Sequence, residues 1–109
     1  MTTESNFLEI AKGLLQKTRQ QKAPWTDAGG HFLLLLKNAR ITLSYQSPVA
    51  EPDFITVTFS NKEGKVAATW TVHEEDPGWE LVNELHEEVR RRAAGWEKVL
   101  ADIEDFIRS

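Results

Sequence analysis

The chain has 109 residues, of which 40% are hydrophobic and 28% charged, with a net charge of −4 and no cysteine. These values predict one globular domain spanning residues 1–109, and the missing cysteines exclude disulfides, thiolate chemistry and cysteine-ligated metals. No apolar run approaches the roughly 20 residues of a membrane span, and the polar start lacks the apolar block of a signal peptide. We therefore expect a cytoplasmic protein without a membrane partner.

The charge is unevenly distributed along the chain. Residues 1–25 carry four basic and two acidic side chains, whereas residues 73–109 carry five basic and eleven acidic ones. An acidic C-terminal third would repel a phosphate backbone, and no dense basic face compensates, so we expect no nucleic-acid partner. Attraction between the two charged ends predicts that the first and last helices are neighbours.

The first predicted helix covers residues 4–22. Its apolar stripe comprises Phe7, Ile10, Ala11, Leu14 and Leu15 at helical spacing. Ala23-Pro24 ends the helix, because proline disfavours helical geometry in the residue before it. Trp25 follows in a loop that extends to Gly29-Gly30. We expect it to fold back over one end of the core with its N–H bonded to a carbonyl; the alternative is an exposed aromatic anchor for a partner.

From His31 onward the hydrophobic period changes from that of a helix to the period of two that strands show. Four strands are predicted, at residues 31–37, 40–46, 53–60 and 65–73. Their short connections favour an antiparallel meander with both helices packed on one face. That face would hold Phe32, Leu34, Leu36, Ile41, Leu43, Tyr45, Ile55, Val57, Phe59, Val66, Ala68, Trp70 and Val72.

The opposite face of the predicted sheet is unusual because it is almost uncharged. It consists of Leu33, Leu35, Thr42, Ser44, Phe54, Thr56, Thr58, Ala67, Thr69 and Thr71. Threonine suits strands in any case, so a solvated face is one interpretation. A contact surface is the other, since an ordinary solvated face carries more Lys and Glu.

A long amphipathic helix is predicted from Asp76 to Arg108, with Asp76 as its N-cap and Pro77 at the first helical position. About 48 Å of helix would overrun strands of about 23 Å, and Gly95 could allow a kink where the overrun begins. The apolar residues beyond it need a cover, which the first helix can supply only in part. These are Trp96, Val99, Leu100, Ile103, Phe106 and Ile107. We therefore predict a homodimer or a hetero-complex built on this segment.

The segment from Glu84 to Gly95 resembles a family of small, uncharacterised bacterial proteins. They end in a helix with the pattern Glu-Leu-x-x-x-x-Arg-Arg-x-Ala-x-Gly, and they pair an early tryptophan (here Trp25) and a strand-opening phenylalanine (here Phe32) with a β-meander. His86 and Val89 stand where the family more often has an aromatic residue and an alanine. The resemblance implies a helix–meander–helix fold and a bacterial or phage origin, but no activity.

No motif in the sequence is typical of catalysis or of cofactor binding. His86 lacks the second histidine of a zinc-binding HExxH helix, so a half-buried structural role is favoured. Residues 73–76, His-Glu-Glu-Asp, point in different directions, and their carboxylates suit a helix N-terminus. No glycine-rich loop joins a strand to a helix, and no G-x-S-x-G is present. Arg90-Arg91-Arg92 predicts a solvated face with Glu87–Arg91 and Glu88–Arg92 pairs, or alternatively an interface hot spot.

The sequence thus favours an α+β protein that is not an enzyme and takes no cofactor or metal. We expect a protein–protein interaction or regulatory module, for which an immunity, antitoxin or anti-defence role is one option, because small acidic proteins can occlude basic partners. The alternative is a small-ligand binder with an aromatic-lined cavity between the sheet and the C-terminal helix. Its lining would be Trp25, Trp70, Trp79 and Trp96.

Overall fold

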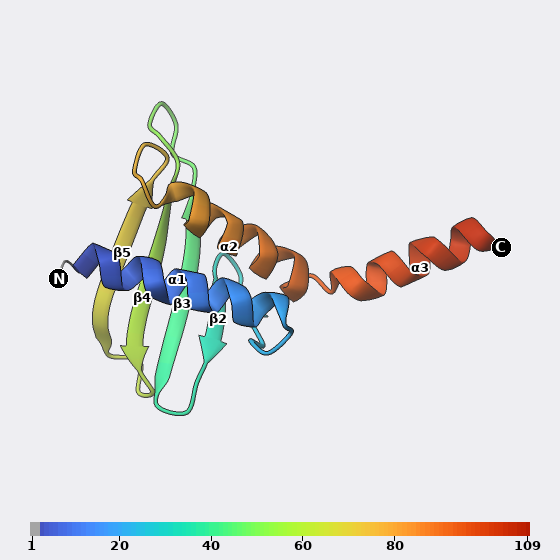
Figure 1. Cartoon of the computed structure of the whole chain (residues 1–109), viewed down its shortest axis with the longest axis horizontal. Helices are drawn as coiled ribbons and strands as arrows, with labels where there is room; N and C mark the ends of the chain where they lie inside the picture. Colours follow the sequence, from blue (N-terminus) through green and yellow to red (C-terminus); the bar gives the residue numbers. More distant parts are fainter. Residues whose placement is uncertain (1–2) are drawn as a thin grey trace.

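The computed structural model describes the backbone of residues 3–109 and the side chains of residues 6–95 and 98–109. It confirms an α+β fold in which a helix and an antiparallel meander precede a helical C-terminus (Figure 1). The elements in chain order are α1 (Thr3–Arg19), β1 (Thr26–Asp27), β2 (Phe32–Leu35), β3 (Ala39–Gln46), β4 (Phe54–Asn61), β5 (Val66–His73), α2 (Trp79–Ala93) and α3 (Trp96–Arg108).

The sheet has five strands in sequence order, each antiparallel to the next. Four were predicted, and the additional strand is the two-residue β1, which pairs with the start of β2. The segment that we expected to be a loop forms this edge because Asp27 Oδ1 accepts the Gly29 N–H at 2.9 Å. Gly29 and Gly30 then turn the chain with φ of 78° and 121°, values that glycine adopts at little cost.

Helices α1 and α2 lie side by side on one face of the sheet, as predicted (Figure 1). The core between the two layers includes Leu43 and Ile55 from the strands and Val82, Leu85 and Val89 from α2, all at most 1% exposed. The strand residues come from the face that alternation assigned to the core. Burial of alternate strand residues against a helical stripe therefore accounts for the two-layer architecture.

Val66 does not lie on the face predicted for it. A register shift between Phe59 and Ser60 places Val66 opposite Ser60, while Ala68 lies opposite Phe59. Directly opposed residues share a face, so the extra residue in β5 moves Val66 to the uncovered side of the sheet, where it is 57% exposed.

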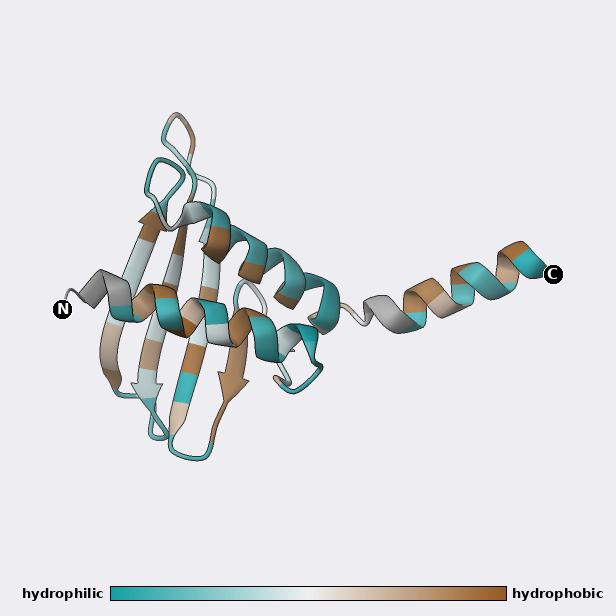
Figure 2. Cartoon of the chain, in the orientation of Figure 1, coloured by the Kyte–Doolittle hydropathy of each residue, from teal (hydrophilic) through white to brown (hydrophobic). Residues whose placement is uncertain are grey.

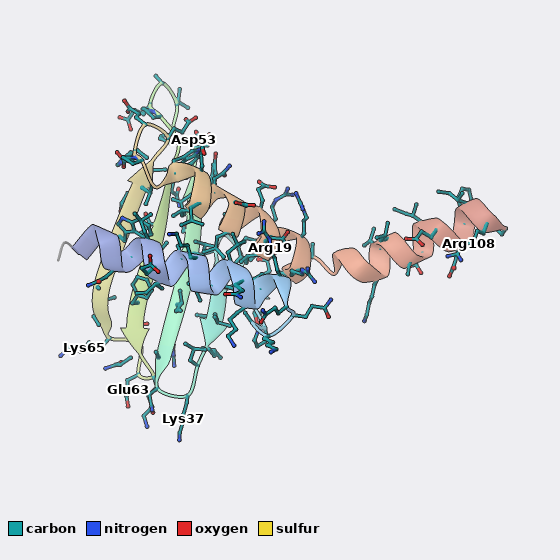
Figure 3. The ribbon with its side chains drawn as sticks, in the orientation of Figure 1. Arg19, Lys37, Asp53, Glu63, Lys65 and Arg108 are labelled. Atoms are coloured by element: carbon teal, nitrogen blue, oxygen red, sulfur yellow. The ribbon has the colours of Figure 1, made fainter. Side chains whose placement is uncertain are left out.

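The neighbouring charged helices predicted from the sequence are confirmed for α1 and α2. Arg19 at the end of α1 donates to Glu84, and its Nε lies 3.9 Å from Glu88 Oε1 (Figure 3). Both acidic residues belong to α2. Because Arg19 and Glu84 are each about half exposed, their pair fixes the helix alignment more than it stabilises the fold, whereas Glu88 is mostly buried.

Trp25 closes one end of the core, as expected, and is 7% exposed. Its Nε1–H donates to Thr18 Oγ1 at 3.0 Å rather than to a carbonyl. Thr18 in turn donates to the Leu14 carbonyl at 2.7 Å, so the indole reaches the helix backbone through a hydroxyl. The expected partner type was wrong because Thr18, a buried residue in the last turn of α1, accepts the N–H in place of a carbonyl.

The C-terminal helical segment begins later than predicted. The helix α2 starts at Trp79 with Gly78 as its N-cap and without a capping side chain. Asp76, the predicted N-cap, instead accepts the His73 backbone N–H at 2.8 Å. That bond closes a turn at the end of β5, and the Asp76-Pro77-Gly78 segment serves as a connection.

The single helix predicted from Asp76 to Arg108, which Gly95 could allow to kink, is instead broken at that glycine into two helices. Gly95 has a φ of 73°, in the left-handed region that glycine adopts without a Cβ penalty. The helix α2 ends at Ala93, and α3 begins at Trp96. Within the described range, no helix is long and apolar enough to cross a membrane.

Candidate protein-interaction surface

Helix α3 projects away from the two-layer body in the direction in which α2 ends (Figure 1). It accounts for much of the longest dimension of the chain, 55 Å against 38 and 26 Å for the other two. Hydrophobic residues recur along the coloured part of this helix (Figure 2). The two-layer body therefore does not cover this amphipathic helix.

The side chains predicted to need a cover are exposed. The exposed fractions are 45% for Val99, 36% for Leu100, 45% for Ile103, 80% for Phe106 and 72% for Ile107. The expectation that the first helix covers part of this segment was wrong, because α3 points away from α1 (Figure 1). We call these five residues the α3 stripe. The side chain of Trp96, also predicted to belong to it, lies outside the described part of the chain.

Acidic residues border the α3 stripe on both sides. At 100° per residue, Asp102 lies beside Val99 and Phe106, and Glu104 lies on the other flank, beside Leu100. Lys98, Ala101 and Asp105 occupy the opposite side of the helix. Arg108 reaches Glu104 at 3.5 Å and Asp105 at 3.6 Å, both exposed contacts. The stripe is thus an apolar band with negatively charged edges.

A hollow of about 290 Å³ lies between α1 and the end of β2. It is lined by Leu14, Lys17, Lys22, Ala23, Leu34 and Leu36. Leu34 is buried at its floor, whereas Leu36 is 51% exposed. We call it the α1–β2 groove: its floor is aliphatic and its two charged side chains are both lysines. Sequence reasoning missed this site because its walls come from separate elements.

A second hollow of about 330 Å³ lies on the other side of α1 and is lined by Lys12, Leu15, Gln16, Arg19, Gln20 and Leu81. Its lining includes two glutamines together with the charged Lys12 and Arg19. Arg19 is already paired with Glu84 and Glu88. Of these two hollows, the α1–β2 groove is the more enclosed, which makes it the better receptor for apolar side chains.

His86 is buried in α2 at 9% exposure, next to Phe32 and Tyr45, whose ring centroids lie 5.6 and 5.1 Å away. Its Nδ1 has no hydrogen-bond partner within the described part of the chain. Burial lowers the pKa of His86, because the charged imidazolium loses its hydration there. The expected structural role fits this position: His86 is a neutral core residue whose ring packs against Phe32 and Tyr45.

Tyr45 and Asp53 form a polar contact at the end of the sheet shown near the top of Figure 3. The Tyr45 hydroxyl donates to Asp53 Oδ2 at 2.5 Å, and the Ser47 hydroxyl donates to Oδ1 at 2.7 Å. These two bonds lower the pKa of Asp53. The bond between Tyr45 and Asp53 also raises the pKa of Tyr45, to about 12. Since the groups satisfy one another, the arrangement connects a loop to a strand and offers no activated nucleophile or base.

The His-Glu-Glu-Asp segment at residues 73–76 holds the chain together locally. Glu74 Oε1 accepts the Asp53 backbone N–H at 2.8 Å, and His73 Nδ1 lies 3.6 Å from Asp76 Oδ2. Among the residues that the structure describes, no three or more histidine and carboxylate side chains converge as metal ligands do.

The arginine run in α2 pairs with glutamates on the same helix. Glu88 lies 3.5 Å from Arg92, as predicted, and also 3.7 Å from Arg91. Glu87 pairs with Arg90 at 2.6 Å, so the predicted Glu87–Arg91 pair was wrong. A spacing of three residues brings the side chains together as readily as four. Most of these groups are exposed, which is typical of a solvated helix face.

The described tryptophans are each engaged in a different contact. Trp25 bonds to Thr18, Trp70 stacks on Phe7 with centroids 5.2 Å apart, and Trp79 meets the Tyr45 ring edge-on at 5.8 Å. Trp25 thus closes one end of the core, while Trp70 and Trp79 pack against other aromatic rings.

Comparison with known proteins gave no match, either to a protein-family model, to a curated protein or to a solved structure. The resemblance of the 84–95 segment to small bacterial proteins therefore stays a prediction, and function must be argued from the surface itself.

Proposed function

We propose that this protein is a non-catalytic protein–protein interaction module whose contact surface is the α3 stripe. One observation carries the proposal: five large apolar side chains line one side of a helix that leaves the body of the protein. Soluble monomers rarely expose a contiguous apolar band of this kind unless it meets a partner.

The dimensions suit recognition of a helix in a groove. Helix α3 has 13 residues, a length of about 20 Å at 1.5 Å per residue. Its apolar positions follow the i, i+3, i+4, i+7 spacing by which amphipathic helices anchor in hydrophobic grooves. Acidic borders further favour a groove with basic edges, since complementary charges speed association and exclude wrong partners.

Ile103→Glu tests the proposal, with Ala101→Glu as its matched control. Both substitutions add one negative charge to the same helix, two residues apart, but Ala101 lies opposite the stripe. We expect the full-length wild-type chain and Ala101→Glu to bind a protein, whether a second copy or another chain, and Ile103→Glu to lose it. Sedimentation and affinity capture would measure this. Equal binding by all three chains, or by none, would contradict the proposal.

A further inference from the structure

We infer that the α3 stripe docks into the α1–β2 groove of a second copy of this chain, so that two protomers exchange their C-terminal helices. This inference rests on the proposed function, because it names the partner of the same surface. It joins two apolar sites that the isolated chain leaves uncovered, one on its projecting helix and one on its body.

The groove matches the stripe in size and apolar character. Cavities of about 150 Å³ in other proteins hold a benzene-sized ring, so a hollow of about 290 Å³ has room for the Phe106 ring together with an aliphatic neighbour. Leu14, Leu34 and Leu36 would supply the apolar contact. Leu36 is 51% exposed in the isolated chain and would become covered.

The charges at the two sites are complementary. Lys17 and Lys22 form no ion pair within the described part of the chain, and neither does Asp102; Glu104 is paired only with the exposed Arg108. Docking would bring the lysines at the groove to the acidic borders of the stripe. Direct pairing of two α3 helices would instead place carboxylates against carboxylates, which disfavours that arrangement.

The interface area requires both helices to dock. Burying a Val, Leu, Ile or Phe side chain removes roughly 60–120 Å² from water, so one stripe and its groove would bury on the order of 900 Å². Stable interfaces bury about 1,200–2,000 Å² in total. One docked helix falls short of this range, whereas two related by a twofold axis reach it. A closed symmetric dimer follows from this comparison.

The position of α3 explains why the partner is a second copy and not the helix's own body. From Gly95 the helix runs outward, away from the sheet and from the groove beside α1 (Figure 1). Reaching its own groove would require α3 to reverse direction across the single connection at Gly95. The outward geometry leaves the stripe accessible to a neighbouring protomer without any rearrangement.

Charge reversal on each side of the proposed contact tests it. The groove variant is Lys17→Glu with Lys22→Glu, and the helix variant is Asp102→Lys with Glu104→Lys. Light scattering and sedimentation should give the wild type a mass of about twice 12.4 kDa at high micromolar concentration. Each variant alone should dimerise at least about tenfold more weakly, because like charges then meet at both dockings.

Mixing the two variants should restore dimers of nearly wild-type affinity, since opposite charges again meet at both contacts of the heterodimer. Lys62→Glu with Lys65→Glu is the matched control, placed in the hairpin between β4 and β5, towards the opposite edge of the sheet from β2 (Figure 3). It makes the same change in charge and should leave the dimer unaffected. Thermal unfolding of every variant would verify that the body remains folded.

Several outcomes would overturn the inference, and they are distinguishable from failure of the proposed function. A wild-type monomer that binds another protein through Ile103 contradicts the second copy as occupant and leaves the interaction module intact. A groove variant that dimerises like the wild type excludes the groove and indicates pairing of α3 with α3. A monomer with a protected α3 indicates closure onto its own body. Variants that dimerise weakly but do not rescue one another also contradict the contact.

Discussion

At the scale of single residues, His86 stands out because its burial is not compensated by a hydrogen bond at Nδ1. Burial lowers its pKa from the ordinary value of 6.5, so the folded chain holds it neutral while the unfolded chain takes up a proton below that pH. The unfolded state then binds more protons, and stability must fall as pH falls below 6.5.

We expect His86→Leu to flatten this dependence. Between pH 7.5 and pH 5.5, wild-type stability should decrease by at most about 1.4 kcal/mol per pH unit, the limit for one proton. The variant should show a smaller decrease, since Leu does not titrate. Urea unfolding at the two pH values measures both. An equal decrease in the two chains would mean that other groups cause it.

Tyr45 is the single tyrosine of the chain, so its ionisation can be followed directly by phenolate absorbance. The bond to Asp53 and the carboxylate charge should place its midpoint near pH 12 rather than 10.0. Because the pKa is raised on folding, the stability that this bond contributes is lost as pH rises through that interval. Asp53→Asn should move the midpoint towards 10. Circular dichroism at the same pH values verifies that the protein titrates in its folded state.

At the scale of elements, Gly95 decides that the C-terminal segment forms two helices. Its left-handed φ is open to glycine, tolerated by asparagine and costly for alanine, by roughly 1–2 kcal/mol. Among the described residues other than its chain neighbours, no heavy atom lies within 4 Å of the position a Cβ would take, so the effect of substitution is one of backbone geometry.

We expect Gly95→Ala to favour a continuous helix through residues 93–96 and Gly95→Asn to preserve the break. Far-ultraviolet circular dichroism should therefore show more helix in the alanine variant, with the asparagine variant close to wild type. Identical spectra from all three chains would mean that contacts, and not this φ, hold the two helices apart.

The larger elements were predictable from the sequence because hydrophobic periodicity reflects which side of each element is buried. Leu43 and Ile55 on the strands and Val82 and Leu85 on α2 follow that rule. Features that depend on a choice between two local hydrogen-bonding arrangements were not predictable from the sequence. Asp76 could cap a helix or close a turn, and it closes the turn. The extra residue in β5, which places Val66 on the other face of the sheet, leaves no signal in the hydrophobic pattern, since alternation continues on either side of it.

The candidate surface was predictable for a simpler reason. Residues 96–107 continue a stripe beyond the length that the sheet can cover, and counting residues reveals the excess. The α1–β2 groove was not predictable, because Lys17, Lys22 and Leu36 meet only once α1 crosses the sheet.

At the scale of the whole molecule, both α1 and α2 cover the same face of the sheet and leave the threonine-rich face open (Figure 1). Register places Thr42, Thr58 and Thr69 in one row across three strands. The sequence left two interpretations of this face, solvated or in contact with a partner. Assembly through α3 favours the interpretation that this face is solvated, since the dimer then does not need it as a contact surface.

We therefore expect Thr58→Lys to leave the dimer unchanged, as a lysine at the centre of a solvated face keeps its charge in water. Ile103→Glu, measured alongside it, should abolish the dimer. Light scattering at matched concentrations distinguishes them. A monomeric Thr58→Lys chain with an unchanged melting temperature would show that the sheet face, and not α3, makes the contact.

Helix α3 is also too short to be stable by itself, because isolated helices below about 12–15 residues are marginal in water. An undocked α3 would unwind and re-form continually, so its amides should exchange with solvent within seconds while those of α2 remain protected. Docking would slow that exchange. Order in the 13 residues of α3 would then rise with the concentration of the protein, because the dimerised fraction rises with it.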